Sequence, residues 1–118
     1  MLLVAFFSTW QMLTQAKGAC SYCSYLYWVD VGPPARIERA KQDGTEREVV
    51  IHDRIDTPSG LSIDYDAQAL YWSDRTFDTI ERVDLRPNHN MTRKVIVRNV
   101  ADCMGVTVFG QYIYWTDE

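Results

Sequence analysis

Two cysteines separated by two residues, Cys20 and Cys23, have the spacing of a thiol redox pair or of one half of a zinc site. A redox pair belongs at the start of a helix within a βαβ unit, and a zinc site needs a second pair of ligands. The sequence supplies neither, because the third cysteine, Cys103, stands alone and the two histidines are far apart. We therefore interpret the pair as structural or incidental, and expect no metal and no cofactor. A redox enzyme is the alternative from a different functional class.

Three aspartates, Asp30, Asp74 and Asp117, each end a copy of the same short pattern. Paired carboxylates can act as general acid and base. Recurrence favours a structural role instead, because an active site breaks internal symmetry whereas a scaffold keeps it. We expect each carboxylate to accept backbone N–H bonds from the following turn, or to pair with Arg39 or Arg82 of the adjacent strand. The sequence therefore predicts that the protein is not an enzyme.

The pattern that contains these aspartates is an internal repeat, and it is the strongest signal in the sequence. The segment LYWVD at 26–30 returns as LYWSD at 70–74 and as IYWTD at 113–117, and its tryptophans lie 44 and 43 residues apart. Two further blocks recur at nearly the same spacing, IERA at 37–40 as IERV at 80–83, and GLSI at 60–63 as GVTV at 105–108. Three blocks that keep their register over this distance establish a repeat of one structural unit.

Each repeat has the pattern of four short strands. In the complete copy we expect them at 60–65, 70–74, 80–85 and 94–98, separated by residues that favour turns. The second strand begins Leu-Tyr-Trp and is apolar on both faces, as in a sheet packed between two others. Such a repeat is typical of a propeller blade. The sequence predicts an all-β fold, a partial β-propeller of about two blades of four-stranded antiparallel sheets, with repeats at 26–69 and 70–112 and a third that starts at 113–118.

The recurring residues are expected to build this scaffold, with the aromatic pairs in the core between blades. The motif consists of Tyr27, Trp28, Asp30, Tyr71, Trp72, Asp74, Tyr114, Trp115 and Asp117. Contacts between blades are expected from Glu38, Arg39, Glu81 and Arg82, and turn positions for Gly60 and Gly105. Cys103 is expected to be a small buried residue, and pairing in a disulfide is the alternative.

Composition and charge narrow the choice of partners. The 118 residues are 47% apolar and 24% charged, which is typical of a globular domain. The net charge of −4 argues against binding to nucleic acid or to anionic lipid. Residues 1–24 are either a signal peptide or a mispredicted N-terminus, since the apolar run at 1–10 suits a signal core but no positive charge precedes it. This run is too short to span a bilayer.

The three motif copies, with IERAKQDGTEREVVI at 37–51 and PSGLSIDY at 58–65, resemble the YWTD, or low-density lipoprotein receptor class B, repeat. The resemblance covers residues 25–118, and Val29 and Ser73 stand where the motif has threonine. It implies the six-bladed propellers of lipoprotein receptors, Wnt co-receptors, nidogen and the epidermal growth factor precursor. Since the repeats here are fewer, we expect a truncated chain that is unstable alone or associates with other copies, because an open blade face exposes large apolar side chains.

The resemblance further implies a non-enzymatic receptor ectodomain whose propeller presents a protein-recognition surface. We expect an extracellular protein ligand, of lipoprotein or Wnt-pathway type, and a parent protein anchored in the plasma membrane by segments outside this chain. Asn90 starts an Asn-Met-Thr sequon in an expected loop, which predicts N-glycosylation in the secretory pathway. An extracellular-matrix structural module of the nidogen type is the alternative. No single ligand-binding residue is assigned, and the candidate recognition loops are 31–36, 52–57, 75–79 and 98–102.

Overall fold

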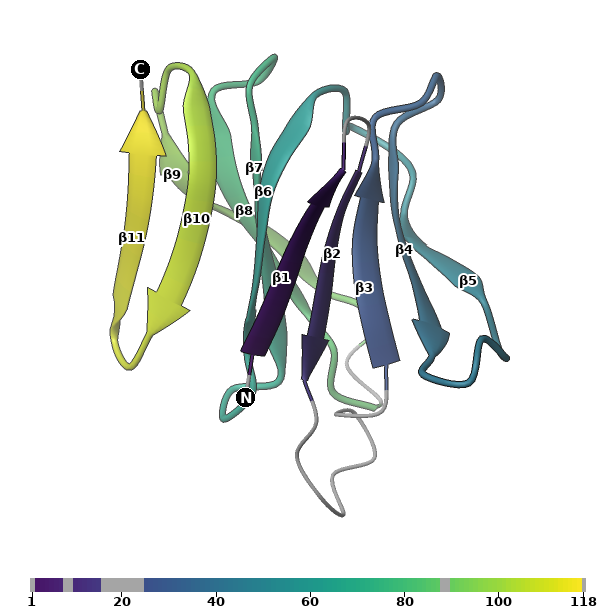
Figure 1. Ribbon diagram of the computed structural model, residues 1–118. Coiled ribbons are helices and arrows are strands. Elements are labelled where there is room, and N and C mark those ends of the chain that lie inside the picture. The colour runs from purple at the N-terminus through teal and green to yellow at the C-terminus, as the bar shows by residue number, and fades with distance from the viewer. Residues whose placement is uncertain (1, 8–9, 16–24, 88–89, 118) are drawn as a thin grey trace. The chain divides into compact units, whose positions relative to one another are not determined.

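The computed structural model describes residues 2–7, 10–15, 25–87 and 90–117 and is built from strands (Figure 1). Eleven antiparallel strands occupy this part of the chain and form three sheets. Within these residues no helix is long and apolar enough to cross a membrane. The chain divides into two compact units, Met1–Asp56 and Thr57–Glu118. The prediction of an all-β fold is confirmed.

The first unit is a single sheet in the order β1-β2-β3-β4-β5. Its strands are β1 (Leu2–Phe7), β2 (Trp10–Gln15), β3 (Tyr25–Asp30), β4 (Arg36–Lys41) and β5 (Glu48–Ile51). Three of these strands, β3, β4 and β5, fall within the predicted repeat, whereas β1 and β2 lie in the segment predicted to be a signal peptide or a mispredicted N-terminus. The apolar and aromatic N-terminal segment has high strand propensity, and β2 pairs along the free edge of β3 from Trp10↔Asp30 to Leu13↔Tyr27. The interpretation of residues 1–24 as a signal peptide stays a prediction.

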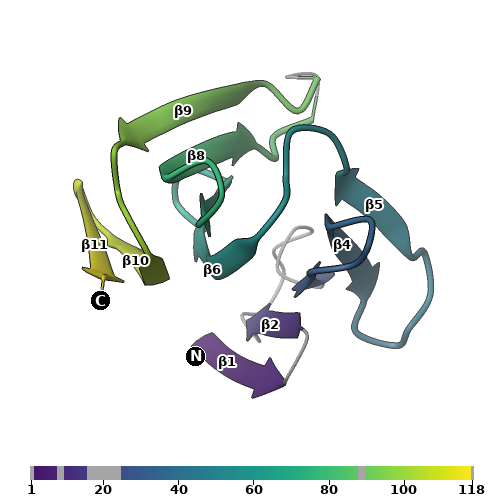
Figure 2. The same cartoon turned by 90° about the horizontal axis from the view of Figure 1, so that it is seen from above.

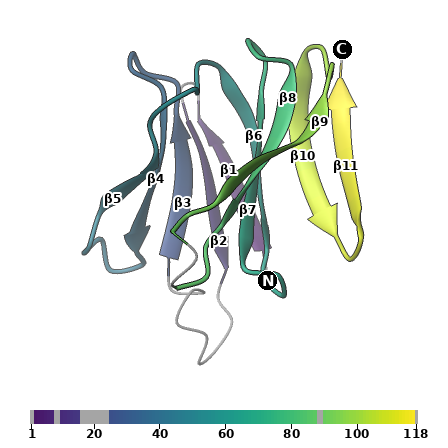
Figure 3. The ribbon, with the colours of Figure 1, turned by 180° about the vertical axis from the view of Figure 1, so that it is seen from behind.

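The larger sheet of the second unit has the order β6-β7-β8-β9. Its strands are β6 (Pro58–Asp64), β7 (Ala69–Asp74), β8 (Thr79–Asp84) and β9 (Arg93–Arg98), each within two residues of its predicted position. Leu70 and Trp72 on one face of β7, and Ala69 and Ser73 on the other, are all fully buried, as expected for a strand that is packed on both faces. In contrast, β9 alternates between half-buried and exposed residues, which suits the edge of a sheet. Figure 3 shows this sheet from behind.

The second sheet of this unit is a hairpin of β10 (Cys103–Phe109) and β11 (Tyr112–Asp117). Seen from above, β10 lies beside β6 (Figure 2). The motif tryptophans Trp28, Trp72 and Trp115 fall on the like strands β3, β7 and β11. On the first two of these strands the tryptophan pairs with the glutamate of the following strand. The repeat in the sequence is therefore a repeat in the structure.

Gly60 and Gly105 lie inside strands β6 and β10, so their prediction as turn residues is wrong. The pairing with the next strand shifts its register between Pro58 and Gly60, and again between Cys103 and Gly105. Gly60 also lies where the two sheets approach most closely, because a Cβ built on it would be 2.7 Å from the backbone nitrogen of Val106. Glycine is needed there for the close approach of two backbones rather than for a turn.

Candidate functional site at the turns of the second unit

Two turns meet at one end of the second unit, the upper end in Figures 1 and 3. One turn, residues 75–78, joins β7 to β8, and the other, residues 99–102, joins β9 to β10. The backbone N–H of Val100 donates to the carbonyl of Asp78 at 3.0 Å. The Arg75 guanidinium pairs with the Asp102 carboxylate at 3.1 Å. We call these two turns, together with Thr57, the turn surface.

The buried Asp74 carboxylate stabilises the turn surface from its inner side. It is fully buried and accepts hydrogen bonds from the backbone N–H groups of Thr76 at 2.9 Å, Phe77 at 3.3 Å and Thr57 at 3.3 Å. The Arg75 N–H donates to the Thr57 carbonyl at 2.9 Å, which ties the start of β6 to the same turn. A carboxylate that accepts several N–H bonds fixes a turn without solvent access. The structural role predicted for Asp74 agrees with these contacts.

The motif aspartate of the first unit accepts a backbone N–H from the following turn, as predicted, and also forms an ion pair. Asp30 accepts the backbone N–H of Gly32 at 2.9 Å and pairs with Arg36 at 2.7 Å. The ion pair of Asp30 is therefore with Arg36 and not with Arg39, the alternative partner predicted for it. Arg36 lies directly opposite Asp30 in the strand register, whereas Arg39 is opposite Tyr27. The third motif aspartate, Asp117, is exposed and lies opposite Cys103.

The charged residues for which contacts between blades are predicted also connect strands within one sheet. Glu38 accepts the indole N–H of Trp28 at 3.1 Å and pairs with Arg47 at 3.1 Å. Glu81 pairs with Arg93 at 2.8 Å, and this guanidinium lies 5.0 Å from the centre of the Trp72 ring. Both units thus contain a cluster of tryptophan, glutamate and arginine. These clusters lie within one sheet because the tryptophan and the glutamate are cross-strand neighbours. The contacts between blades stay a prediction.

Arg39 and Arg82 each lie directly opposite a motif tyrosine on the neighbouring strand. Arg39 donates to the Tyr27 hydroxyl at 3.3 Å, and Arg82 lies 5.9 Å from the centre of the Tyr71 ring. Burial raises the pKa of the Tyr27 phenol, although the hydrogen bond from Arg39 acts in the opposite direction. Tyr27 therefore stays neutral and does not serve as a base.

The contacts that do join the two sheets of the second unit come from small polar residues that the sequence analysis missed. The Ser59 hydroxyl donates to the Cys103 carbonyl at 2.5 Å, and the Val108 N–H donates to the Ser62 hydroxyl oxygen at 3.1 Å. Beside them, Ile80, Val100, Cys103 and Val106 form a buried apolar cluster. The signal for Ser62 was the recurring block GLSI/GVTV, in which a hydroxyl residue returns as Thr107. Ser59 lies outside this block, and Met104 takes the corresponding position in the next copy.

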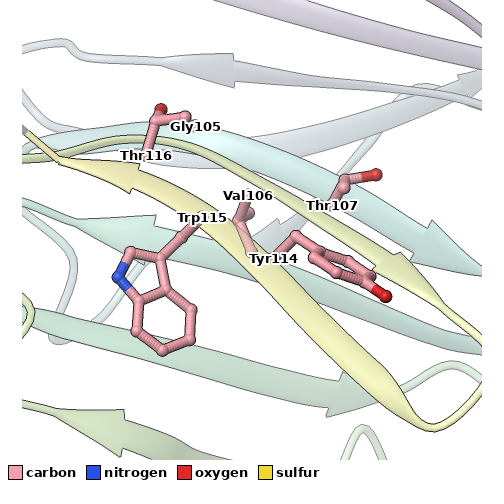
Figure 4. Close-up of a pocket in the computed structure, with 6 residues that line it drawn as sticks. All are labelled: Gly105, Val106, Thr107, Tyr114, Trp115 and Thr116. Atoms are coloured by element: carbon pink, nitrogen blue, oxygen red, sulfur yellow. The ribbon is translucent and has the colours of Figure 1, made fainter.

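The hairpin β10–β11 presents the largest exposed aromatic side chains of the motif. Tyr114 is 53% exposed and Trp115 is 43% exposed. They line an open hollow of about 270 Å³ together with Val106 and its neighbours. Figure 4 shows Trp115 on one side of the hairpin and Thr116 on the other. None of the described residues that line this hollow is charged, so the hollow suits packing against an apolar surface better than catalysis.

Several predicted features can now be placed. The free thiol Cys103 is fully buried among the described residues, whereas Cys20 and Cys23 lie outside them. Over the described ranges no group of three His, Cys, Asp or Glu side chains could hold a metal ion.

Phe77, at the tip of the turn surface, is 48% exposed. A rigid turn with an exposed aromatic ring and an ion pair suits recognition of another protein.

Comparison with known proteins agrees with this architecture. The sequence model of the family "low-density lipoprotein receptor repeat class B" matches residues 24–65. The chain contains the YWTD, or low-density lipoprotein receptor class B, repeat. It is 36% identical over 94 residues to human low-density lipoprotein receptor-related protein 5 and 29% identical over 92 residues to the vitellogenin receptor Yl of Drosophila melanogaster. These matches cover 79% and 78% of this chain but only 6% and 4% of the two relatives.

A solved YWTD structure shows the same fold. The chain matches a protein in the crystal structure of a nidogen/laminin complex with a TM-score of 0.72 and 30% identity, over 80% of this chain and 35% of the other. The fold is a partial β-propeller. In these terms β6–β9 form one YWTD blade, and β10 and β11 begin the next. The turn surface lies at one end of these blades.

Proposed function

We propose that this chain is part of a ligand-binding YWTD propeller in the extracellular region of a cell-surface receptor related to the lipoprotein receptors. The turn surface carries this proposal. Its two turns are fixed by Asp74 and by the contact between Arg75 and Asp102, and they leave Phe77 exposed. Pre-organised turns lose little conformational entropy on binding, which favours affinity for a protein ligand.

The relatives support a receptor and a protein ligand. Their names describe a vitellogenin receptor and a low-density lipoprotein receptor-related protein. We infer an extracellular location reached through the secretory pathway, with membrane anchoring by other parts of the parent protein. Uptake of a lipoprotein-type ligand and co-reception of a Wnt-type signal are the two roles that this family suggests. We assign the chain a binding role and no catalytic one, since two of its three motif carboxylates, Asp30 and Asp74, are engaged in turns and an ion pair.

A matrix module is the second candidate, and one observation favours it. The matching solved structure is of a nidogen/laminin complex. A module of this type would bind another matrix protein through its propeller and would have no part in uptake. The two candidates therefore differ in the ligand that the turn surface recognises.

Surface plasmon resonance with the immobilised chain tests both candidates, with purified vitellogenin, low-density lipoprotein and laminin as probes. We expect binding to one of the first two, and Phe77→Ala should weaken it about tenfold or more, because an exposed aromatic anchor is worth about 1–4 kcal/mol in an interface. Met91→Ala is the matched control, since Met91 is 37% exposed on the β8–β9 loop and lies outside the turn surface. Binding to laminin alone would favour the matrix module. Binding to no probe, or equal effects of both variants, would contradict the proposal.

A further inference from the structure

The loop between β8 and β9 contains an Asn-Met-Thr sequence that the turn surface does not use. Asn90, Met91 and Thr92 are all exposed, and none of them belongs to a strand. Attachment of a glycan requires an Asn-X-Ser or Asn-X-Thr sequence that an enzyme can reach. The accessibility of all three residues satisfies this requirement.

This loop lies at the end of the sheet opposite the turn surface. The Leu85 N–H donates to the Gln68 carbonyl at 2.8 Å, which joins the loop to the β6–β7 turn. The Asp84 N–H donates to the Thr92 carbonyl at 2.9 Å, which closes the base of the loop. Since successive hairpins of an antiparallel sheet turn at alternate ends, these contacts place Asn90 away from residues 75–78 and 99–102.

Further contacts fix the base of the loop while leaving Asn90 free for modification. Asp84 is buried and holds Arg86 through a two-pronged ion pair at 2.5 Å. Asn90 and Met91 both have positive φ values, 51° each, a conformation that asparagine tolerates better than most residues. A glycan on Asn90 would therefore extend into solvent without displacing a packed side chain.

We propose that Asn90 carries an N-linked glycan, and that this glycan marks the end of the blade that does not bind ligand. In the reaction, the Asn90 amide nitrogen forms a bond to the anomeric carbon of a lipid-linked oligosaccharide. The lipid diphosphate leaves, and the nitrogen loses one proton. The proposal rests on the proposed function, because this donor is met in the secretory pathway. The glycan also lies near the start of the edge strand β9, where a bulky polar group hinders pairing with another chain.

The test uses the full chain expressed in secretory animal cells behind a heterologous signal sequence. Intact mass spectrometry before and after peptide-N-glycosidase should show loss of one oligosaccharide and conversion of Asn90 to aspartate. Thr92→Ala should abolish the glycan, whereas Thr92→Ser should retain it. An unmodified Asn90 would overturn the proposal.

A matched variant separates the glycan from the proposed function. Ala101→Thr places a threonine two residues after Asn99, which is exposed and lies in the turn surface with a positive φ of 61°. This variant should gain a second glycan and lose binding to the probe protein, whereas Asn90→Gln should lose its glycan and keep binding. A glycan at Asn99 with none at Asn90 would overturn this inference and leave the proposed function intact. A glycan at Asn90 in a chain that binds no probe would support this inference and contradict the proposed function.

Discussion

Replacing Gly60 with alanine should destabilise the second unit, because it adds an atom where β6 meets β10. The new methyl carbon would lie 2.7 Å from the Val106 nitrogen, 2.9 Å from the Ser73 hydroxyl oxygen and 3.0 Å from the Gly105 Cα. Two of these three atoms are backbone, so β10 must shift to make room. Overpacking of this kind costs about 1–3 kcal/mol. Alanine restricts the unfolded chain and returns about 0.4–1 kcal/mol, so we expect a net loss of about 1–2 kcal/mol.

Gly105→Ala is the matched control. The nearest atom to its added Cβ is the Thr116 hydroxyl oxygen at 3.6 Å, an ordinary contact. This variant should be neutral or slightly more stable, since only the effect on the unfolded chain remains.

Both variants should be measured by thermal unfolding of the dilute full chain, followed by circular dichroism. A loss of about 1–2 kcal/mol corresponds to a fall in Tm of roughly 4–15 °C for a unit of this size. We expect this fall for Gly60→Ala and none for Gly105→Ala. Equal Tm values for the two variants would refute the close approach of the two sheets.

Three further outcomes follow from the described contacts. Glu81→Ala should lower the free energy of unfolding by about 3–5 kcal/mol in urea denaturation, because it breaks an ion pair with Arg93 in which the two side chains are only 10% and 6% exposed. Arg47→Ala, at a position whose side chain is 62% exposed, should cost less than about 1 kcal/mol. Similar losses would contradict this assignment. The Cys103 thiol should resist iodoacetamide in the native protein and react in urea, because its side chain is fully buried. Peptide mass spectrometry would measure this labelling, and a labelled thiol in the native protein would refute its burial. The chain should self-associate in sedimentation velocity, and Tyr114→Ser should reduce this association by removing an exposed aromatic ring. An unaltered chain that stays monomeric would contradict this prediction.

The repeated blocks were sufficient to predict the strands of the second unit. Leu70, Tyr71 and Trp72 lie together in a run that is apolar on both faces, which only a strand packed on both sides explains. Turn residues on either side limited its length. Spacing between the tryptophans then determined the size of the repeat.

Contacts between side chains were harder to predict, because they depend on strand register. Asp30 pairs with Arg36 rather than Arg39 since the β3–β4 turn places Arg36 directly opposite. A shift of one residue would have changed this partner. Between the two sheets of the second unit, the hydrogen bonds formed by Ser59 and Ser62 were not predicted. Hydroxyl groups give weak sequence signals, since most serines lie at the surface.

The N-terminal hairpin could not be predicted from the repeat. Its residues match no copy of the motif, so their apolar character suggested a signal core as readily as a strand. Pairing of β2 with β3 depends on a free edge that appears only in the folded sheet.

In this structure, consecutive YWTD blades stack through backbone and hydroxyl contacts. Amide hydrogen exchange at Val108 tests this arrangement most directly. This N–H donates to Ser62 of the neighbouring sheet, so it should be protected in the unaltered chain. Ser62→Ala should speed its exchange roughly 2- to 10-fold, as expected for loss of one hydrogen bond. Thr107→Ala, at an exposed position beside it, should leave the rate unchanged. Exchange of the Val108 amide at the rate of an unfolded peptide in the unaltered chain would contradict the stacked arrangement.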